Sequence, residues 1–384
     1  MNNSFNKEVN RKSSNAIKWD RQANKNNLPF WIADSDYVTA PCVIETLNEV
    51  VNHGVFGYNA IPDEFKNAVV SWYKKRYNSE VENEWVIPSS GVILEIRILL
   101  DIITKEHDTV ILQTPVYHTF YHVLEEMNRE IIQNKLIKKD DTYYMDFDNL
   151  EKLFKEGHKT MILCSPHNPL GRIWRKEEVE RVIMLAKKYN VFVIIDEIHS
   201  DLNISNIKFT SAIDFVDKYD NIAVCNAPSK AFNLAGLSTS YIIIPSVSLR
   251  DRFNQQTRRE FLNSPTVFGY KATIAAYTHG DAWIDEQNSH LRNNYQYLKE
   301  YLNKELPKLI VTKLEGTYLV WLDLTYTNLI TEQLLNRCNE YGITCSGGAN
   351  FCYDYESYLR FNIACPFEQM KEGLERLVKA FKEF

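Results

Sequence analysis

Short apolar runs that alternate with longer amphipathic stretches dominate the chain from about residue 85 to residue 245. Each run is of strand length and ends in turn-forming or polar residues. The runs lie in the segments DTVILQTP, KTMILCSPHNP, VFVIIDEIH, NIAVCNAPSK and STSYIIIP. Continuous apolar runs are typical of strands that a sheet buries on both faces. With amphipathic helices between them, as predicted for 175–189, they predict an α/β domain with a largely parallel sheet.

The last hundred residues have a different pattern. Helical periodicity near 284–304 and 366–383 flanks the strand-like segments LIVTKLEGTYLVWLDL and YLRFNIAC, which predicts a smaller α+β domain. The first forty residues are polar and then turn apolar at LPFWIAD, as expected of an arm that packs on this domain. We therefore expect an N-terminal arm with part of the small domain (1–47), a large domain (48–280) and a C-terminal small domain (281–384).

Composition excludes several classes of protein. Apolar residues make up 45% of the chain and charged residues 24%, which is too hydrophobic for a mainly disordered protein. The formal net charge of −6 provides no overall positive field for nucleic acid or an anionic membrane. The seven cysteines are scattered without zinc-ligand spacing, so we expect no metal site and reduced thiols. The N-terminus lacks a signal-peptide core and the apolar runs are too short to cross a bilayer, so we expect a cytoplasmic protein.

Polar side chains that follow the apolar runs are candidate site residues, because ligands in parallel sheets bind beyond the carboxyl ends of the strands. Lys230, in NAPSKAFNLAGL, could form a Schiff base with an aldehyde cofactor, or it could be a solvated surface lysine. Asp196 ends the run VFVIID, where a carboxylate needs a partner. That partner could be a helix N-terminus, a structural cation or the protonated nitrogen of a pyridine ring.

Two turn-like segments offer further candidates. Asn168 lies in SPHNPLG, where a turn alone would explain the residues. Gly91 opens an apolar helical pattern after Ser89 and Ser90, so the segment is either a serine-capped helix or a phosphate site on exposed helix amides. A dinucleotide-dependent oxidoreductase is not favoured, because no Gly-x-Gly-x-x-Gly follows a strand. Walker-type and His-Glu-x-x-His motifs are absent as well.

The ordered series of segments in this chain resembles a known family. The segments are FWIADSD, HGVFGYN, SSGV, PVYH, SPHNPLGRIW, DEIHSDL, APSKAFNLAGL, EGTYLVW and RFNIACP. From about residue 28 to the C-terminus the chain is similar to fold-type I pyridoxal-phosphate enzymes of the class I/II aminotransferase superfamily, and more narrowly to the MalY/PatB type of cystathionine beta-lyase. The resemblance implies a large cofactor-binding domain with a mostly parallel seven-stranded sheet flanked by helices, and a smaller α+β domain.

The resemblance also implies roles around the cofactor ring. Lys230 would bond covalently to the cofactor aldehyde, Asp196 would pair with the ring nitrogen and Asn168 would hydrogen-bond the ring hydroxyl. Tyr117 of PVYH matches the residue that stacks on the ring. His199 falls where related aminotransferases carry a tyrosine near the ring hydroxyl, so either a hydrogen bond or simple packing is open for it.

At the phosphate end the resemblance places Gly91, Val92 and Ser229. Aminotransferases of the wider superfamily often place an arginine eight residues beyond the lysine to hold the phosphate, whereas this chain has Ser238. Phosphate binding is therefore expected to rely on backbone amides and hydroxyl groups.

On the substrate side, Arg360 matches the arginine that grips the substrate carboxylate, a task for which a planar guanidinium suits better than an ammonium. Ala33 is a further substrate-side position. Tyr58 of VFGYN matches the tyrosine that reaches the neighbouring subunit's site, with roles in catalysis and substrate binding. This implies a homodimer with shared active sites.

The activity implied is β-elimination from L-cystathionine or another cysteine S-conjugate, which yields a thiol, pyruvate and ammonia. A true aminotransferase would use the same lysine, aspartate and arginine, and only HGVFGYN and RFNIACP favour the lyase. A lyase-like protein with an additional regulatory role is a third reading. The residues do not identify the thiol fragment that leaves, and they imply neither a nucleic-acid nor a membrane partner.

Overall fold

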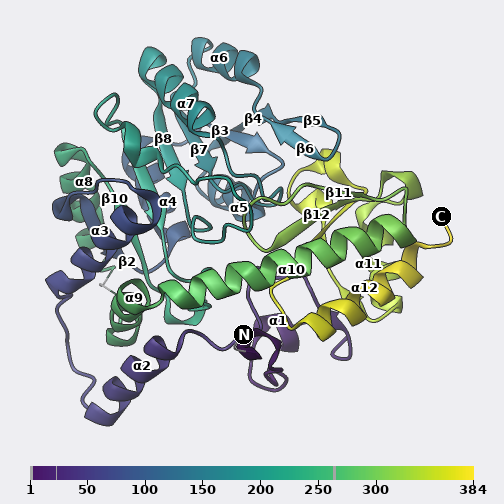
Figure 1. Ribbon diagram of the computed structural model, residues 1–384. Helices are drawn as coiled ribbons and strands as arrows, with labels where there is room; N and C mark the ends of the chain where they lie inside the picture. Colours follow the sequence, from purple (N-terminus) through teal and green to yellow (C-terminus); the bar gives the residue numbers. More distant parts are fainter. Residues whose placement is uncertain (1–2, 23, 263–264) are drawn as a thin grey trace.

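The computed structural model describes residues 3–22, 24–262 and 265–384. A seven-stranded sheet forms the centre of the larger part, in the order β2-β10-β9-β8-β7-β3-β4 (Figure 1). The strands are β2 (Val86–Ser89), β3 (Thr109–Thr114), β4 (Glu130–Lys135), β7 (Thr160–Cys164), β8 (Phe192–Asp196), β9 (Ile222–Asn226) and β10 (Ser240–Ile243). Only β10 runs antiparallel to its two neighbours. The mostly parallel seven-stranded sheet is therefore confirmed.

The sheet is buried on both faces, as its continuous apolar runs predict. Along β8, Val193 and Ile195 belong to one apolar core, while Phe192 and Ile194 belong to a second core on the other face. Helices from both sides close these two cores. They are α3 (Asp63–Tyr77), α4 (Val92–Ile103), α5 (His118–Glu126), α6 (Phe147–Lys155), α7 (Lys176–Tyr189), α8 (Val247–Arg259) and α9 (Val267–His279).

A second, antiparallel sheet lies toward the C-terminus, in the order β11-β12-β15-β14. Its strands are β11 (Ile310–Val311), β12 (Leu319–Asp323), β14 (Ser346–Gly347) and β15 (Tyr358–Asn362). In Figure 1 three helices lie beside it. They are α10 (Asp281–Glu305), α11 (Thr331–Glu340) and α12 (Phe367–Phe381).

The segment 309–324, expected as strand-like, forms β11 and β12 with a gap between them. Glu315 in this interruption accepts hydrogen bonds from Arg172 and Arg175, at 2.8 and 2.7 Å. These partners belong to the larger part of the molecule. A buried carboxylate between the two strands is thus paired with two guanidinium groups outside the sheet.

The N-terminal segment packs against the C-terminal part. Strand β1 (Leu28–Pro29) pairs in parallel with β13 (Ile343–Thr344), and the ring of Phe30 stacks on that of Phe361 at 4.1 Å. Helix α2 (Pro41–His53) then leads away from this contact (Figure 1).

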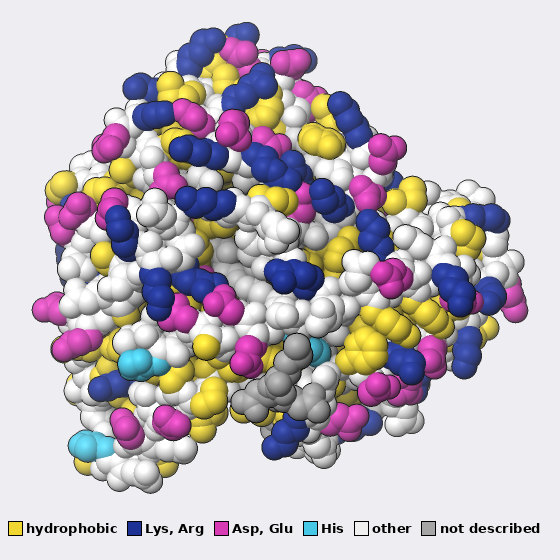
Figure 2. Space-filling view, in the orientation of Figure 1, with side chains coloured by type: hydrophobic (Ala, Val, Ile, Leu, Met, Phe, Trp, Pro, Cys, Tyr) yellow, Lys and Arg dark blue, Asp and Glu magenta, His cyan; other side chains and the backbone are white. Residues whose placement is uncertain are grey.

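The remaining elements are short. They are α1 (Ile17–Asp20), the hairpin β5 (Ile137–Lys139) and β6 (Thr142–Tyr144), and the 3-10 turns η1 (Asn3–Asn6), η2 (Asn83–Trp85), η3 (Ala212–Phe215), η4 (Ala235–Leu237), η5 (Thr325–Thr327), η6 (Gly348–Asn350) and η7 (Tyr353–Tyr355). Among the described residues no helix combines the length and the apolar character needed to cross a membrane. In Figure 2 basic and acidic side chains intermix over the visible face, without a large patch of one sign.

The register of the central sheet brings three predicted site segments together. Strands β7, β8 and β9 are neighbours and run parallel, so their carboxyl ends meet at one edge. Asn168 follows β7, Asp196 ends β8 and Lys230 follows β9. This edge is where an α/β sheet is expected to bind a ligand.

Candidate active site

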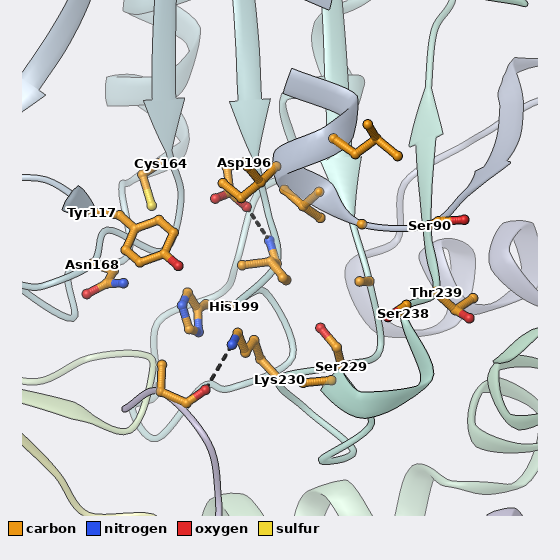
Figure 3. A pocket seen from close by; sticks show the side chains of 18 residues that line it. Ser90, Tyr117, Cys164, Asn168, Asp196, His199, Ser229, Lys230, Ser238 and Thr239 are labelled. Carbon is orange, nitrogen blue, oxygen red and sulfur yellow. Dashed lines mark hydrogen bonds between the residues drawn. The ribbon is translucent and has the colours of Figure 1, made fainter. Parts of the chain in front are cut away.

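A cavity of about 360 Å³ lies at the carboxyl ends of β7, β8 and β9. Such a volume is in the range of small-molecule sites. Figure 3 shows the side chains around it. The lining residues are Ala33, Ser90, Gly91, Val92, Ile93, Leu94, Tyr117, Cys164, Asn168, Asp196, Ile198, His199, Ala227, Ser229, Lys230, Ala235, Ser238 and Thr239. The cavity thus brings together nine of the eleven residues that the sequence singled out.

Lys230 provides a half-buried amine that lines the cavity. Its Nζ donates a hydrogen bond to the carbonyl oxygen of Ala33 at 2.8 Å (Figure 3). Burial lowers the pKa of this amine, although the nearby carboxylate of Asp34 opposes the shift. A lowered pKa increases the uncharged fraction of a lysine, which is the form that attacks a carbonyl or accepts a proton.

Asp196 places a carboxylate against the same space from the end of β8. Its Oδ1 accepts a hydrogen bond from the backbone amide of Ile198 at 3.0 Å. Burial raises the pKa of Asp196 to about 6, and the charge of Lys230 lowers it in part. A cation bound in the cavity would lower this pKa further and complete the carboxylate's pairing. The helix-cap alternative does not hold, because Ile198 lies in a turn outside the named helices.

Arg360 and Asn168 form a buried pair beside the cavity. The guanidinium donates from Nη1 to Asn168 Oδ1 at 3.1 Å and from Nη2 to the carbonyl oxygen of Trp31 at 2.7 Å. Its Nη2 also donates to Ser346 Oγ at 3.4 Å, and its Cζ lies 4.8 Å from the ring centroid of Phe351. Burial lowers the pKa of Arg360 to about 10, so it stays charged at neutral pH. The acceptors named here are uncharged oxygens, so they do not neutralise the positive charge of this buried cation. The guanidinium is therefore suited to bind a carboxylate.

Two further predicted residues lie at this end of the cavity. Tyr117 precedes α5, and its ring lies next to Asn168 and Cys164 in Figure 3. His199 is buried, and burial lowers the pKa of its imidazole to about 3, with Lys230 and Arg360 adding to the shift. The ring is therefore neutral near pH 7 and can donate from one nitrogen only. Its Nδ1 is buried without a hydrogen-bond partner in the described chain.

The opposite end of the cavity has backbone amides and hydroxyl groups. Gly91 precedes α4 with φ 156°, and a Cβ at this position would point into open space. Val92 begins the helix and Gly91 is its N-cap residue, so the capping position is not occupied by a serine. Ser229 lies between Lys230 and Ser238 in Figure 3 and also lines the cavity. Exposed amides at the N-terminus of a twelve-residue helix favour an anion there.

Sequence reasoning named Ser90 and Ser238 near the expected phosphate site without giving either a role of its own, and it did not mention Thr239. Ser90, Ser238 and Thr239 also line the cavity. Ser238 has positive φ, at 47°, which turns the chain between η4 and β10. Ser238 and Thr239 directly precede β10, so they lie at the amino end of a strand. A search for polar residues at the carboxyl ends of strands does not find them.

Tyr58 and Arg360 are the two predicted residues outside the cavity lining. Arg360 lies beside it, as described above. Tyr58 is fully exposed, in a segment without regular secondary structure after α2. Its neighbours Val55 and Phe56 are exposed as well. The structure thus places this tyrosine away from its own chain's cavity.

Comparison with known proteins gives a consistent result. The family model described as "Aminotransferase class I and II" matches residues 26–377. Cystathionine beta-lyase PatB of Bacillus subtilis (strain 168) is 34% identical, with 98% of this chain and 99% of that protein covered. Protein MalY of Escherichia coli (strain K12) is 32% identical, with 98% of each chain covered.

Solved structures of similar proteins have the same fold. Cystalysin from Treponema denticola, whose structure contains pyridoxal 5'-phosphate, superimposes with a TM-score of 0.94 at 30% identity, and 99% of this chain and 98% of that chain are covered. The pyridoxal-phosphate-bound C-S lyase from Staphylococcus hominis gives a TM-score of 0.92 at 31% identity with the same coverage.

Proposed function

Because the chain belongs to the class I and II aminotransferase family, we propose that it is a pyridoxal-phosphate-dependent carbon-sulfur β-lyase. It cleaves L-cystathionine or other cysteine S-conjugates to a thiol, pyruvate and ammonia. One observation carries the proposal: a half-buried amine and a buried carboxylate line one cavity and a buried guanidinium lies beside it, in a chain whose relatives include cystathionine beta-lyases and C-S lyases.

The cavity fits pyridoxal phosphate. Lys230 supplies an amine for the aldehyde and Asp196 a carboxylate for the ring nitrogen. At the other end, the space in front of Gly91 and the hydroxyls of Ser229 and Ser238 accept a phosphate. Tyr117 supplies an aromatic face and Asn168 an amide near the ring hydroxyl.

The chemistry of the proposed reaction divides between the cofactor and the chain. When bound, pyridoxal phosphate supplies the electron sink that makes the substrate's Cα–H bond acidic. Arg360 holds the substrate carboxylate, because a guanidinium can bond both of its oxygens. Asn168 keeps that guanidinium in place through its Oδ1. This fixes Cα relative to the amine of Lys230.

Lys230 then acts as the base that removes the Cα proton. Its lowered pKa increases the fraction of uncharged amine, and the carbonyl oxygen of Ala33 accepts a hydrogen bond from its Nζ. The carbon–sulfur bond breaks at Cβ, the sulfur leaves with the bonding electron pair and takes up a proton, and the electron pair from Cα forms the Cα–Cβ double bond. Water then hydrolyses the released 2-aminoacrylate to pyruvate and ammonia. His199, neutral beside these groups, adds no positive charge to compete with Arg360 for the carboxylate.

The proposal also covers the oligomeric state, the domains and the cellular location of the protein. Tyr58 completes the active site of a second copy in a homodimer, which explains why a tyrosine is fully exposed beside exposed Val55 and Phe56. The three parts 1–47, 48–280 and 281–384 are the proposed domains. The seven cysteines are all unpaired, which fits the reducing conditions of the cytoplasm.

The proposal predicts sustained release of pyruvate and thiol from L-cystathionine or S-ethyl-L-cysteine without any keto acid. Purified protein supplied with pyridoxal phosphate is assayed for both products, and equal amounts are expected over many turnovers. An aminotransferase would instead require a keto acid and form no free thiol. Product formation only after keto acid is added would contradict the lyase proposal.

A further inference from the structure

A second cavity lies one side chain away from Arg360. It has a volume of about 300 Å³ and lies between α5 and the segment 349–353. We call it the α5 cavity, and its lining comprises His118, Tyr121, His122, Glu125, Gln133, Ala349, Asn350, Cys352 and Tyr353. The proposed function assigns no role to any of these residues.

The α5 cavity and the active-site cavity share a wall. Tyr117 lines the active site, and the next residue, His118, lines the α5 cavity. The ring of Phe351 contacts His118 at 5.7 Å between centroids, and Arg360 lies 4.8 Å from the same ring. Arg360 also helps to lower the pKa of His118 to about 4, although burial is the larger cause. The ring of Phe351 is thus the one side chain that separates Arg360 from the wall of the α5 cavity.

The wall of the α5 cavity contains polar atoms that the described chain does not satisfy. Tyr121 Oη and His118 Nδ1 are buried without a hydrogen-bond partner. The thiol of Cys352 lies near the tyrosine and contributes to its raised pKa, but a thiol is a weak partner. Buried polar atoms without partners are costly, so a ligand in this space would stabilise the site.

The charge of the lining is one-sided. Glu125 is its only carboxylate, and the lining contains neither lysine nor arginine. The side chain of Glu125 is 61% exposed, and its ion-pair partner in the described chain is His122 at 3.9 Å, beyond hydrogen-bond distance. Lys135, on the adjacent strand β4, is paired with Asp354. A group that ends in a carboxylate would meet Glu125 without a free cation beside it.

We propose that the α5 cavity binds the sulfur substituent of the substrate, and that Glu125 selects substituents that end in an ammonium group over those that end in a carboxylate. This rests on the proposed lyase function and names the class of leaving group that it accepts: a thiol that carries an amine.

The test compares S-(2-aminoethyl)-L-cysteine with S-carboxymethyl-L-cysteine on the enzyme loaded with pyridoxal phosphate. The two thiols differ as leaving groups, so the quantity that matters is the change in the ratio of their kcat/KM values between variants. Glu125→Gln is expected to lower the ratio of kcat/KM for the aminoethyl substrate to kcat/KM for the carboxymethyl substrate by about fivefold. This is the effect expected from the loss of one exposed charge pair. Glu125→Lys should lower it further. Both changes should appear in KM, with kcat within about twofold, because Glu125 binds the substituent and does not act on Cα.

Glu126→Gln is the matched control, since Glu126 is the next residue of α5, is exposed and lies outside the lining. It should leave the ratio unchanged. An unchanged ratio in both Glu125 variants, with pyruvate still released from S-ethyl-L-cysteine, would overturn the subsite and leave the lyase function standing. No pyruvate from any of these substrates or from β-chloro-L-alanine would overturn both.

Discussion

Replacement of Lys230 by alanine is expected to abolish pyruvate release, with a fall in kcat of about a thousandfold or more, the upper range for loss of a positioned base. The variant also loses the amine that bonds to the cofactor aldehyde. In wild-type protein, borohydride reduction should attach the cofactor irreversibly to one lysine, and mass spectrometry of the digested protein should find it on Lys230. The variant should bind the cofactor without this covalent attachment.

Lys271→Ala provides a control, because Lys271 is an exposed lysine on α9, outside the cavity. This variant should keep both the activity and the attachment. Lys230→Arg keeps a positive charge at the site but cannot bond to an aldehyde in the same way, so it should be as inactive as the alanine variant. Retained activity in Lys230→Ala would refute the assignment of the base.

The sequence predicted which residues meet at the central cavity, because their meeting follows from sheet geometry. A buried parallel sheet requires continuous apolar runs, and the residues that end neighbouring runs must meet. Asn168, Asp196 and Lys230 meet at β7, β8 and β9 for this reason. Their roles as cofactor ligands came from the resemblance and remain predictions, since a strand end by itself selects no chemistry.

Features that depend on contacts between distant segments were not predictable in the same way. The interruption at Glu315 depends on Arg172 and Arg175, well over a hundred residues away along the chain. The partnership of Arg360 with the carbonyl of Trp31 joins the two ends of the chain. Periodicity describes local preference, and such pairings are fixed only when the chain folds.

The α5 cavity shows the same limit of local reasoning. His118 and Glu125 lie at opposite ends of α5, and Cys352 comes from a turn near the C-terminus. No motif links these residues, and only the fold places them around one space. Specificity toward the leaving group is therefore a property of tertiary structure here, whereas the residues proposed to act on Cα can be found from the ends of the strands.

Replacement of Arg360 by alanine is expected to weaken binding of the substrate carboxylate by about 2 to 5 kcal/mol, a loss of roughly thirtyfold or more in affinity. The loss is large because Arg360 is only 2% exposed. Water therefore cannot fully replace the hydrogen bonds that the substrate carboxylate loses. Arg360→Lys should fall between wild type and Arg360→Ala, since an ammonium keeps the charge but cannot bond both carboxylate oxygens in parallel. Dissociation constants are measured from the change in cofactor absorbance on titration with an unreactive amino acid.

The same titration with an amine that lacks the carboxylate separates this role from a structural one. Arg360 also donates to Asn168 and to the Trp31 carbonyl, so its removal could disturb the cavity for every ligand. If the guanidinium binds the carboxylate, Arg360→Ala should lower affinity for the amino acid while affinity for the amine changes by less than about threefold. Equal losses for both ligands would show that Arg360 supports the cavity and does not grip the substrate.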